Sequence, residues 1–176
     1  MKRKLLLGSG VAGVSLLLAA SPALAQDADD PSVYLQAVMD NLWVFIAGIL
    51  VFFMQAGFAL VEAGLTRSKN VANIMAKNIA DMCIGVLAFY AVGYAFAYGD
   101  GGGWFIGGNS YFLSGSSLFE ITEGLSGATD FFFQVVFAAT AVTIASGAMA
   151  GRTKFSAYLM FAGLMTAFIY PVVVHW

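Results

Sequence analysis

The sequence is poor in charged residues, which make up only 10% of its 176 positions and leave a formal net charge of -2. Soluble domains carry about a quarter charged residues, so this shortage excludes an ordinary soluble domain. The slight negative charge also excludes the basic surface that nucleic-acid binding requires, and we predict no nucleic-acid partner. Hydrophobic residues fill 60% of the chain instead. We therefore expect an integral membrane protein that is embedded in the lipid bilayer.

Cysteine and histidine are almost absent. Cys83 is the only cysteine, which excludes a disulfide within the chain. His175 is the only histidine and lies at the end of the last apolar run, where a structural or interfacial role is the ordinary interpretation. The sequence has no nucleophile–base set, no metal-ligating cluster and no phosphate-binding loop. We therefore predict no enzymatic activity, no metal site and no cofactor.

Residues 1–25 are typical of a secretory signal peptide. Residues 2–4 are basic, residues 5–20 are apolar, and residues 23–25 read Ala-Leu-Ala, the small-x-small pattern of a cleavage site. An uncleaved first span is the alternative, but the acidic stretch that follows favours cleavage before Gln26. We therefore predict a signal peptide over 1–25 and a transmembrane region over 26–176.

Four long apolar segments follow the signal peptide, at about 41–65, 73–99, 131–151 and 155–176. Each contains an uncharged run close to the roughly 18 to 20 residues with which a helix crosses a bilayer. The fold class that we predict is therefore an all-α membrane protein, a polytopic bundle of transmembrane helices.

The basic residues indicate the orientation of this bundle. Outside the signal peptide they all lie in or beside the segments that join the first span to the second and the third to the fourth: Arg67, Lys69, Lys77, Arg152 and Lys154. The other connecting segments carry only acidic residues. The positive-inside rule then places the basic segments in the cytoplasm and the mature N-terminus outside. The signal peptide requires the same topology, so we predict a multi-pass protein of a bacterial inner (plasma) membrane.

The third predicted span carries two helical patterns. Phe133 and Phe137 are four residues apart and therefore share a face. A stripe of small residues at the same spacing follows them: Ala139, Thr143, Gly147 and Gly151. Small residues let helix backbones approach closely in a membrane, so we expect this span inside a bundle. The pattern alone leaves both a packing role and a binding role open for the aromatic pair.

Polar residues inside the first two spans form a predicted structural network. Gln55 and Glu62 are seven residues apart, two turns along one face of the first span. Four residues share a face at the start of the second span, at spacings of three, four and four: Asn70, Asn73, Lys77 and Asp81. Ionisable groups in a membrane are costly and usually pair with one another or line a pathway. We interpret the set as a cytoplasmic-side network that joins the two spans, with a direct role in conduction as the alternative.

The segment between Asp100 and Asp130 is long for a plain loop and is rich in glycine and aromatic residues. Several of its aromatic side chains suit the membrane–water interface: Trp104, Phe105, Tyr111 and Phe112. An interfacial anchor is one interpretation of this segment, and the wall of an outer vestibule is the other.

Three long, ungapped stretches resemble one family. Residues 54–70, MQAGFALVEAGLTRSKN, are similar to the first helix and following loop of the ammonium transporters of the Amt/Mep/Rh group. Residues 133–152, FQVVFAATAVTIASGAMAGR, resemble the third helix of that family, and residues 154–176, KFSAYLMFAGLMTAFIYPVVVHW, resemble the fourth. The resemblance covers essentially the whole predicted mature chain.

The resemblance implies a homotrimer of eleven-helix subunits, of which this chain holds the first four transmembrane helices. It implies that aromatic residues recruit ammonium at the outer mouth of a narrow apolar pore, where the ion loses a proton. Ammonia and the proton then cross with the help of two pore histidines. Phe133 matches the aromatic residue of the recruitment site, and Phe137 matches the outer ring of the phenylalanine gate. The implied cytoplasmic partner is a regulatory protein of the P-II type.

The sequence departs from the family pattern near its end. The two pore histidines lie in later helices of the family and have no counterpart here, because His175 matches neither of them. Trp176 comes too early to match the tryptophan of the recruitment site. We therefore expect a portion that is incomplete at its C-terminus and that does not transport ammonium by itself.

Three functions remain open at this point. The first is channel-type uptake of ammonium, with this chain as the N-terminal part of a longer protein. The second is an ammonium-sensing membrane receptor whose signalling domain follows residue 176. The third is a four-helix membrane protein that does not conduct. A cytoplasmic signalling domain would distinguish sensing from transport, and folding of the chain alone as a monomer would favour the third function.

Overall fold

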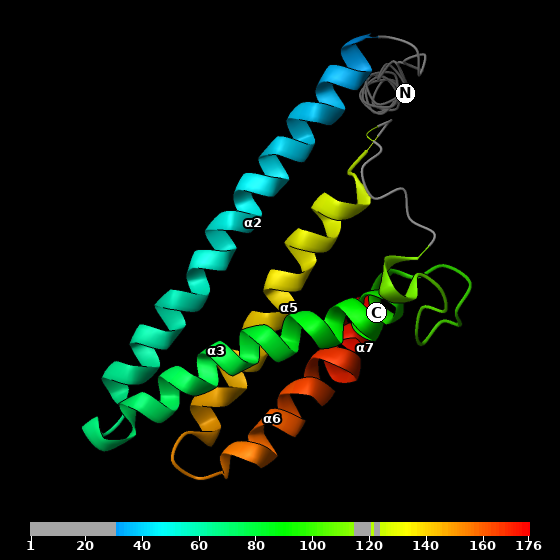
Figure 1. Cartoon of the computed structure of the whole chain (residues 1–176). Helices are drawn as coiled ribbons and strands as arrows, with labels where there is room; N and C mark the ends of the chain where they lie inside the picture. The colour runs from blue at the N-terminus through cyan, green and yellow to red at the C-terminus, as the bar shows by residue number, and fades with distance from the viewer. Residues whose placement is uncertain (1–30, 115–120, 122–123) are drawn as a thin grey trace, which may run out of the picture.

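The computed structural model describes residues 31–114, 121 and 124–176 (Figure 1). The predicted signal peptide, Glu120 and Glu123 lie outside the described residues. Within the described part the regular elements are all helices, with no strand among them. Four helices are long and apolar enough to cross a membrane: Pro31–Leu65, Ser68–Tyr98, Gly127–Met149 and Phe155–His175. The predicted spans fall on these four helices, and their boundaries in the membrane stay predictions.

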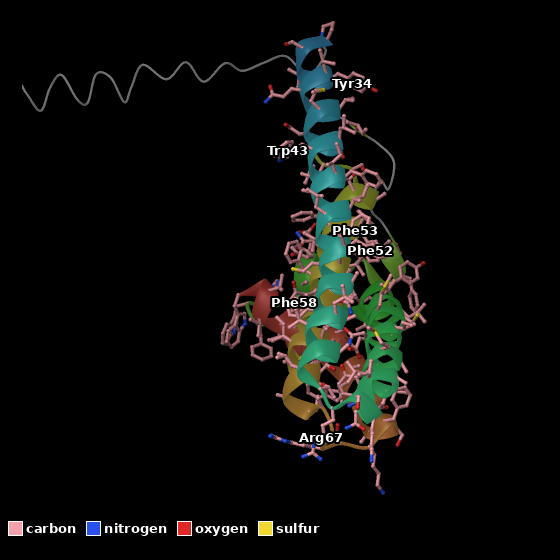
Figure 2. All side chains as sticks on the ribbon, turned by 90° about the vertical axis from the view of Figure 1, so that its left-hand side faces the viewer. Tyr34, Trp43, Phe52, Phe53, Phe58 and Arg67 are labelled. Atoms are coloured by element: carbon pink, nitrogen blue, oxygen red, sulfur yellow. The ribbon has the colours of Figure 1, made fainter. Side chains whose placement is uncertain are left out.

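The first helix, α2, runs from Pro31 to Leu65 without a break. Proline suits its first position because the first N–H groups of a helix have no partner within the helix. Its 35 residues reach about 52 Å at 1.5 Å per residue, farther than a bilayer core of about 30 Å. Aromatic side chains project along much of its length, from Tyr34 and Trp43 to Phe58 (Figure 2). Most of its apolar side chains are exposed, which suits a helix that faces lipid.

The second long helix is continuous but contains a wider turn. A short 3-10 turn, η1 (Ser68–Asn70), leads into α3 (Val71–Ala88). A π-helical turn, η2 (Phe89–Gly93), then connects α3 to α4 (Tyr94–Tyr98). Beyond α4 the chain makes a further 3-10 turn, η3 (Tyr111–Leu113).

The third helix, α5, runs from Gly127 to Met149, and Ser126 caps its start. The Ser126 hydroxyl accepts a hydrogen bond from the Thr129 N–H at 3.3 Å, which satisfies one of the free donors of the first turn. Asn41 of α2 also binds this start: its amide donates to the Gly124 carbonyl at 2.9 Å and accepts from the Ser126 N–H at 2.8 Å. The two helices are therefore joined where α5 begins.

The fourth long helix also contains a π-helical turn. It consists of α6 (Phe155–Leu164), η4 (Met165–Ile169) and α7 (Tyr170–His175). Pro171 has no N–H to continue the regular ladder, so a local change of helical period next to it is expected.

The four long helices run alternately in opposite directions, and α5 lies among the others (Figure 1). It packs against both α2 and α3, and α3 packs in turn against α6. Short connections join α2 to α3 and α5 to α6 at one end of the bundle, which we call the basic end because it carries Arg67, Lys69, Arg152 and Lys154.

The two π-helical turns cross each other at a glycine. A Cβ atom at Gly93 of η2 would lie 2.5 Å from the Thr166 carbonyl oxygen of η4 and 3.2 Å from Pro171 Cγ. Only a residue without a side chain permits this approach. A similar contact holds α3 to α5, because a Cβ at Gly85 would lie 3.3 Å from Ala139 Cα. The helices thus meet backbone to backbone, as membrane helices do at small residues.

Candidate functional site

The two phenylalanines that the sequence singles out lie together on α5. The rings of Phe133 and Phe137 are 5.1 Å apart between centroids and meet edge to face at 65°. Both side chains are half-buried. An edge-to-face pair leaves part of an aromatic face free, and that face carries the negative charge density that attracts a cation. The geometry therefore permits the contact with a small cation that the family resemblance implies.

A second aromatic cluster lies beside this pair and was not predicted. Phe131 packs against Phe89 at 6.2 Å, Tyr90 at 6.0 Å and Tyr94 at 5.6 Å between ring centroids. Phe89 is fully buried, so the cluster forms a core that joins the second long helix to α5 near the start of α5. The sequence showed that Phe131 is apolar, but no periodicity within one helix could identify its partners on another.

Asp130 begins the same region of α5 and receives two side-chain hydrogen bonds. The Tyr94 hydroxyl donates to its Oδ2 at 2.7 Å, and Gln134 Nε2 lies 3.5 Å from its Oδ1. A carboxylate in the first turn of a helix also interacts favourably with the positive end of the helix dipole. Asp130 is thus held in place next to the aromatic residues.

The polar residues near the basic end form a connected network around Glu62. Glu62 is only 8% exposed. Its Oε2 accepts hydrogen bonds from Asn78 Nδ2 of α3 at 3.0 Å and from the Ser146 hydroxyl of α5 at 3.2 Å. One carboxylate of α2 therefore binds both neighbouring helices.

Lys77 and Asp81 lie in the same region, and both contact Tyr158. Both residues are fully buried on α3. Lys77 Nζ lies 4.6 Å from the Tyr158 ring centroid, and the Tyr158 hydroxyl donates to Asp81 Oδ2 at 2.5 Å. Lys77 Nζ and Asp81 Oδ1 have no hydrogen-bond partner among the described residues. The tyrosine of α6 therefore links the cation and the anion to the fourth helix.

Gln55 makes the third polar connection between α2 and α5. Its Nε2 donates a hydrogen bond to the Thr143 hydroxyl at 2.8 Å. The Thr143 hydroxyl in turn donates to Gln55 Oε1 at 3.1 Å. Thr143 is fully buried. This reciprocal pair holds the middle of α5 against α2.

Not all predicted members of the network are engaged in the same way. The structure brings Gln55, Glu62, Lys77 and Asp81 into one region, whereas Asn73 is exposed on α3. Asn70 lies nearer, next to the turn at Gly151, where a Cβ would be 3.6 Å from its Nδ2. Three residues that the sequence did not single out complete the network: Asn78, Ser146 and Tyr158. Asn78 follows Lys77 directly, so its polar side chain inside a span was the available signal.

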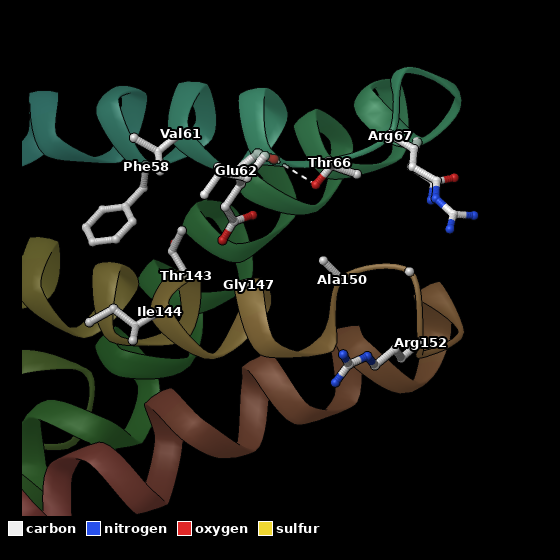
Figure 3. A pocket seen from close by; sticks show the side chains of 13 residues that line it. Phe58, Val61, Glu62, Thr66, Arg67, Thr143, Ile144, Gly147, Ala150 and Arg152 are labelled. Atoms are coloured by element: carbon white, nitrogen blue, oxygen red, sulfur yellow. Dashed lines mark hydrogen bonds between the residues drawn. The ribbon is translucent and has the colours of Figure 1, made fainter.

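A cavity of about 620 Å³ opens between α2 and α5 beside this network (Figure 3). Phe58 and Glu62 project into it from α2, and Thr143 and Ile144 face them from α5. Glu62 is the acidic residue of the lining, whose other charged members are the exposed Arg67 and Arg152: the full set is Phe58, Val61, Glu62, Leu65, Thr66, Arg67, Asn70, Thr143, Ile144, Gly147, Ala150, Gly151 and Arg152. The space is thus apolar along α2 with one carboxylate in its wall.

The end of α7 is held at the opposite end of the bundle. His175 Nδ1 donates to the Ala97 carbonyl at 3.0 Å. Trp176 stacks on Trp104 at 6.2 Å and 17° and meets Phe105 at 5.4 Å between centroids. His175 therefore makes a structural contact, and the glycine-rich segment after α4 packs against the last helix.

Comparison with known proteins identifies the family of this bundle. The family model described as Ammonium Transporter Family matches residues 42–176. The chain is 44% identical over 170 residues to ammonium transporter Amt2 of Archaeoglobus fulgidus, an alignment that covers 93% of this chain and 34% of that protein. It is 47% identical over 141 residues to putative ammonium transporter 1 of Caenorhabditis elegans, covering 78% of this chain and 25% of the relative.

Solved structures show the same fold. A structure titled Sensor Amt Protein superposes with a TM-score of 0.75 at 37% identity and covers 81% of this chain and 34% of that chain. A Mep2 mutant from Candida albicans superposes with a TM-score of 0.67 at 21% identity, over 78% of this chain and 31% of that one. The chain thus spans about a quarter to a third of the length of the relatives that it matches. The predicted all-α, polytopic membrane fold is confirmed, and the chain belongs to the ammonium transporter family.

Proposed function

We propose that this chain is part of a protein that carries ammonium or ammonia across a membrane by a channel-type mechanism. The family supports transport of ammonium. The observation that supports the channel most directly is the arrangement along α5. Phe133 and Phe137 lie on the same face of α5 as Ile144. Ile144 is seven residues, or about 10 Å, beyond Phe137 along the helix, and it lines the cavity. One face of α5 therefore carries an aromatic pair and, beyond it, part of the wall of the cavity.

Each part of this face has a distinct task in the proposed mechanism. Phe133 and Phe137 offer aromatic faces to ammonium as it loses water, a contact worth about 0.5 to 2 kcal/mol. Apolar side chains that follow on this face, Ile144 among them, disfavour a fully hydrated ion, because they cannot replace the hydrogen bonds of its water shell. Phe137, one turn deeper than Phe133, is the gate of this arrangement.

The test compares two phenylalanines of the full-length protein. Phe137→Ala removes one ring of the pair, whereas Phe161→Ala removes a ring that packs against the core of α5 and α6. We expect Phe137→Ala to change the rate of methylammonium uptake by about two- to thirty-fold, the equivalent of the cation–π contact, and Phe161→Ala to change it much less. Uptake is measured in cells without another ammonium transporter, at matched amounts of protein in the membrane. Equal effects of the two substitutions would contradict the gate.

Ammonium sensing is the second candidate function. The observation that favours it is the likeness to the structure titled Sensor Amt Protein, at 37% identity. A sensing protein would use the same aromatic pair to bind ammonium but would pass the signal to a cytoplasmic domain. Ammonium-dependent change in an attached signalling activity, without net uptake, would separate sensing from transport.

The proposal extends to assembly and location. We place the protein in a bacterial inner (plasma) membrane as a homotrimer, with its mature N-terminus outside and a P-II-type protein as the regulatory partner on the cytoplasmic side. The family supports membrane embedding and an ammonium substrate. The exposed apolar side chains along α2 suit either lipid or a second subunit.

A further inference from the structure

The buried charges at the basic end of the bundle do not balance. Glu62, Lys77 and Asp81 are the buried acidic and basic side chains that the described residues place there. Two carboxylates against one ammonium group leave one negative charge in excess. A buried charge without a compensating partner is strongly unfavourable, so something must neutralise it.

Of the two buried carboxylates, Glu62 is the one that lines the cavity between α2 and α5. Lys77 and Asp81 are both held on Tyr158, one over its ring at 4.6 Å and the other through its hydroxyl. Glu62 receives only neutral donors, Asn78 and Ser146. The arginines that line the same cavity are exposed, and Figure 3 shows Arg67 turned away from Glu62.

One oxygen of Glu62 is available to a ligand. Both hydrogen bonds end on Oε2, and Oε1 accepts none from the described residues. Oε1 is directed toward α5, where a Cβ at Gly147 would lie 3.7 Å from it. Because Gly147 has no side chain, the space beside this oxygen is open, and it belongs to the 620 Å³ cavity.

The rest of the wall indicates what kind of cation fits. Phe58 lies four residues before Glu62 on α2 and lines the same cavity, so a carboxylate and an aromatic ring lie on one face. Hard metal cations take six or more oxygen ligands, and Glu62 supplies the only carboxylate that the described residues place in this wall. A cation with N–H donors needs fewer oxygens and is attracted by an aromatic face.

We propose that Glu62 is an inner binding site for a small monovalent cation of the ammonium class, separate from the aromatic pair Phe133 and Phe137. The cation donates an N–H to Glu62 Oε1 and rests against the ring of Phe58. The inference rests on the proposed function for its substrate class. It adds a second ammonium-binding site to the proposed transport pathway, at the basic end and next to the network that joins α2, α3 and α5.

The first experiment measures access to Glu62 in the unmodified protein. The full-length protein in lipid vesicles is treated with a hydrophobic carbodiimide, which reacts with carboxyl groups in apolar surroundings, and the adduct is located by mass spectrometry. We expect modification at Glu62, and we expect unmodified Glu62 to be lost at least threefold more slowly in ammonium chloride than in sodium chloride at the same pH and ionic strength; the adduct and the amide that ammonia can form from the activated carboxyl group both count as loss. Equal rates in the two salts would overturn the site, because a Glu62 carboxyl group that is only protonated, or that has only a structural role, would react at the same rate in ammonium chloride and in sodium chloride.

The second experiment removes the charge and keeps the shape. In Glu62→Gln the remaining amide oxygen still accepts from Asn78 and Ser146, so the joints between helices are retained. We expect the ammonium concentration for half-maximal flux to rise about tenfold, the effect of losing one charge-assisted hydrogen bond. Asp40→Asn, the same change at an exposed position of α2, is the matched control and should leave that concentration unchanged.

The two experiments separate this site from the proposed function. The inner site would be overturned if the unmodified protein conducts ammonium but ammonium does not protect Glu62 and Glu62→Gln leaves the ammonium concentration for half-maximal flux unchanged. The proposal of transport would not be affected by that result. Protection of Glu62 without flux would leave the site standing and refute transport. If Glu62→Gln does not fold, the salt comparison on the unmodified protein decides alone.

Discussion

Tyr158→Phe tests whether the buried tyrosine of α6 holds the charged network together. The substitution deletes one hydroxyl, the donor to Asp81 Oδ2, and keeps the ring over which Lys77 Nζ lies. Because Asp81 Oδ1 already has no partner among the described residues, the change leaves both oxygens of a fully buried carboxylate without one. The perturbation is therefore electrostatic and creates almost no cavity.

The expected loss of stability can be bounded from two sides. A hydrogen bond to a charged group contributes about 1.5 to 3 kcal/mol in water-soluble proteins. Hydrogen bonds between membrane helices average about 0.6 kcal/mol and reach about 1.7 kcal/mol, because the unfolded chain in the membrane also finds partners. A buried, charged acceptor belongs near the top of the second range, so we expect Tyr158→Phe to lower the free energy of unfolding by about 1 to 2 kcal/mol.

The assay is reversible unfolding in mixed detergent micelles, followed by helix content. Tyr90→Phe is the control, because the Tyr90 ring is partly exposed and its hydroxyl bonds to no other described residue. It should change the unfolding free energy by less than about 0.5 kcal/mol. A double-mutant cycle with Asp81→Asn should then show a coupling of similar size to the loss in Tyr158→Phe. Equal, small losses in both tyrosine variants would refute the reasoning.

Two further predictions follow from the packing and the charge distribution. Gly93→Ala should destabilise the bundle by about 1 to 3 kcal/mol in the same unfolding assay, because its Cβ would meet the Thr166 carbonyl oxygen 2.5 Å away; an unchanged stability would show that the π-helical turns do not pack as described. In a variant without Cys83, a membrane-impermeant thiol reagent added from outside should modify Asn109→Cys and not Ser68→Cys, as the positive-inside rule requires, and the reverse pattern would invert the topology.

The sequence predicted the helices and much of the polar network because both depend on the period of a single helix. The seven-residue spacing of Gln55 and Glu62 placed them on one face, and both bind α5 from that face. The four-residue spacing of Lys77 and Asp81 likewise placed them together, and both are fully buried. Periodicity identifies such a face without reference to any other helix.

The partners across helices could not be predicted in the same way. Ser146 is 84 residues from Glu62, and Tyr158 is 77 residues from Asp81. The spacing of residues along one helix indicates which side chains share a face, but it does not indicate which other helix packs against that face. The spacing of Lys77 and Asp81 placed them on one face of α3, but it could not indicate Tyr158, which the structure places against both of them.

The small-residue stripe on α5 also serves more than one contact. Ala139 packs against Gly85 of α3, whereas Thr143 bonds Gln55 of α2 and Gly147 leaves space for Glu62. Its last member, Gly151, lies beyond the end of α5 in a turn with a positive φ of 70°. Side chains four apart drift slowly around a helix with 3.6 residues per turn, so one stripe can face two neighbours in succession.

The length of α2 has a consequence for how the protein responds to the lipids around it. Its uncharged stretch, residues 41–61, measures about 31 Å and equals the thickness of an average bilayer core. Biological membranes differ from that thickness by a few ångströms, and a single helix adapts to such mismatch by tilting. Here Asn41 bonds the N-terminal end of that stretch to the start of α5, and Glu62 bonds its C-terminal end to α3 and α5. Tilt of α2 therefore requires tilt of its neighbours, and a change in bilayer thickness acts on the bundle as a unit.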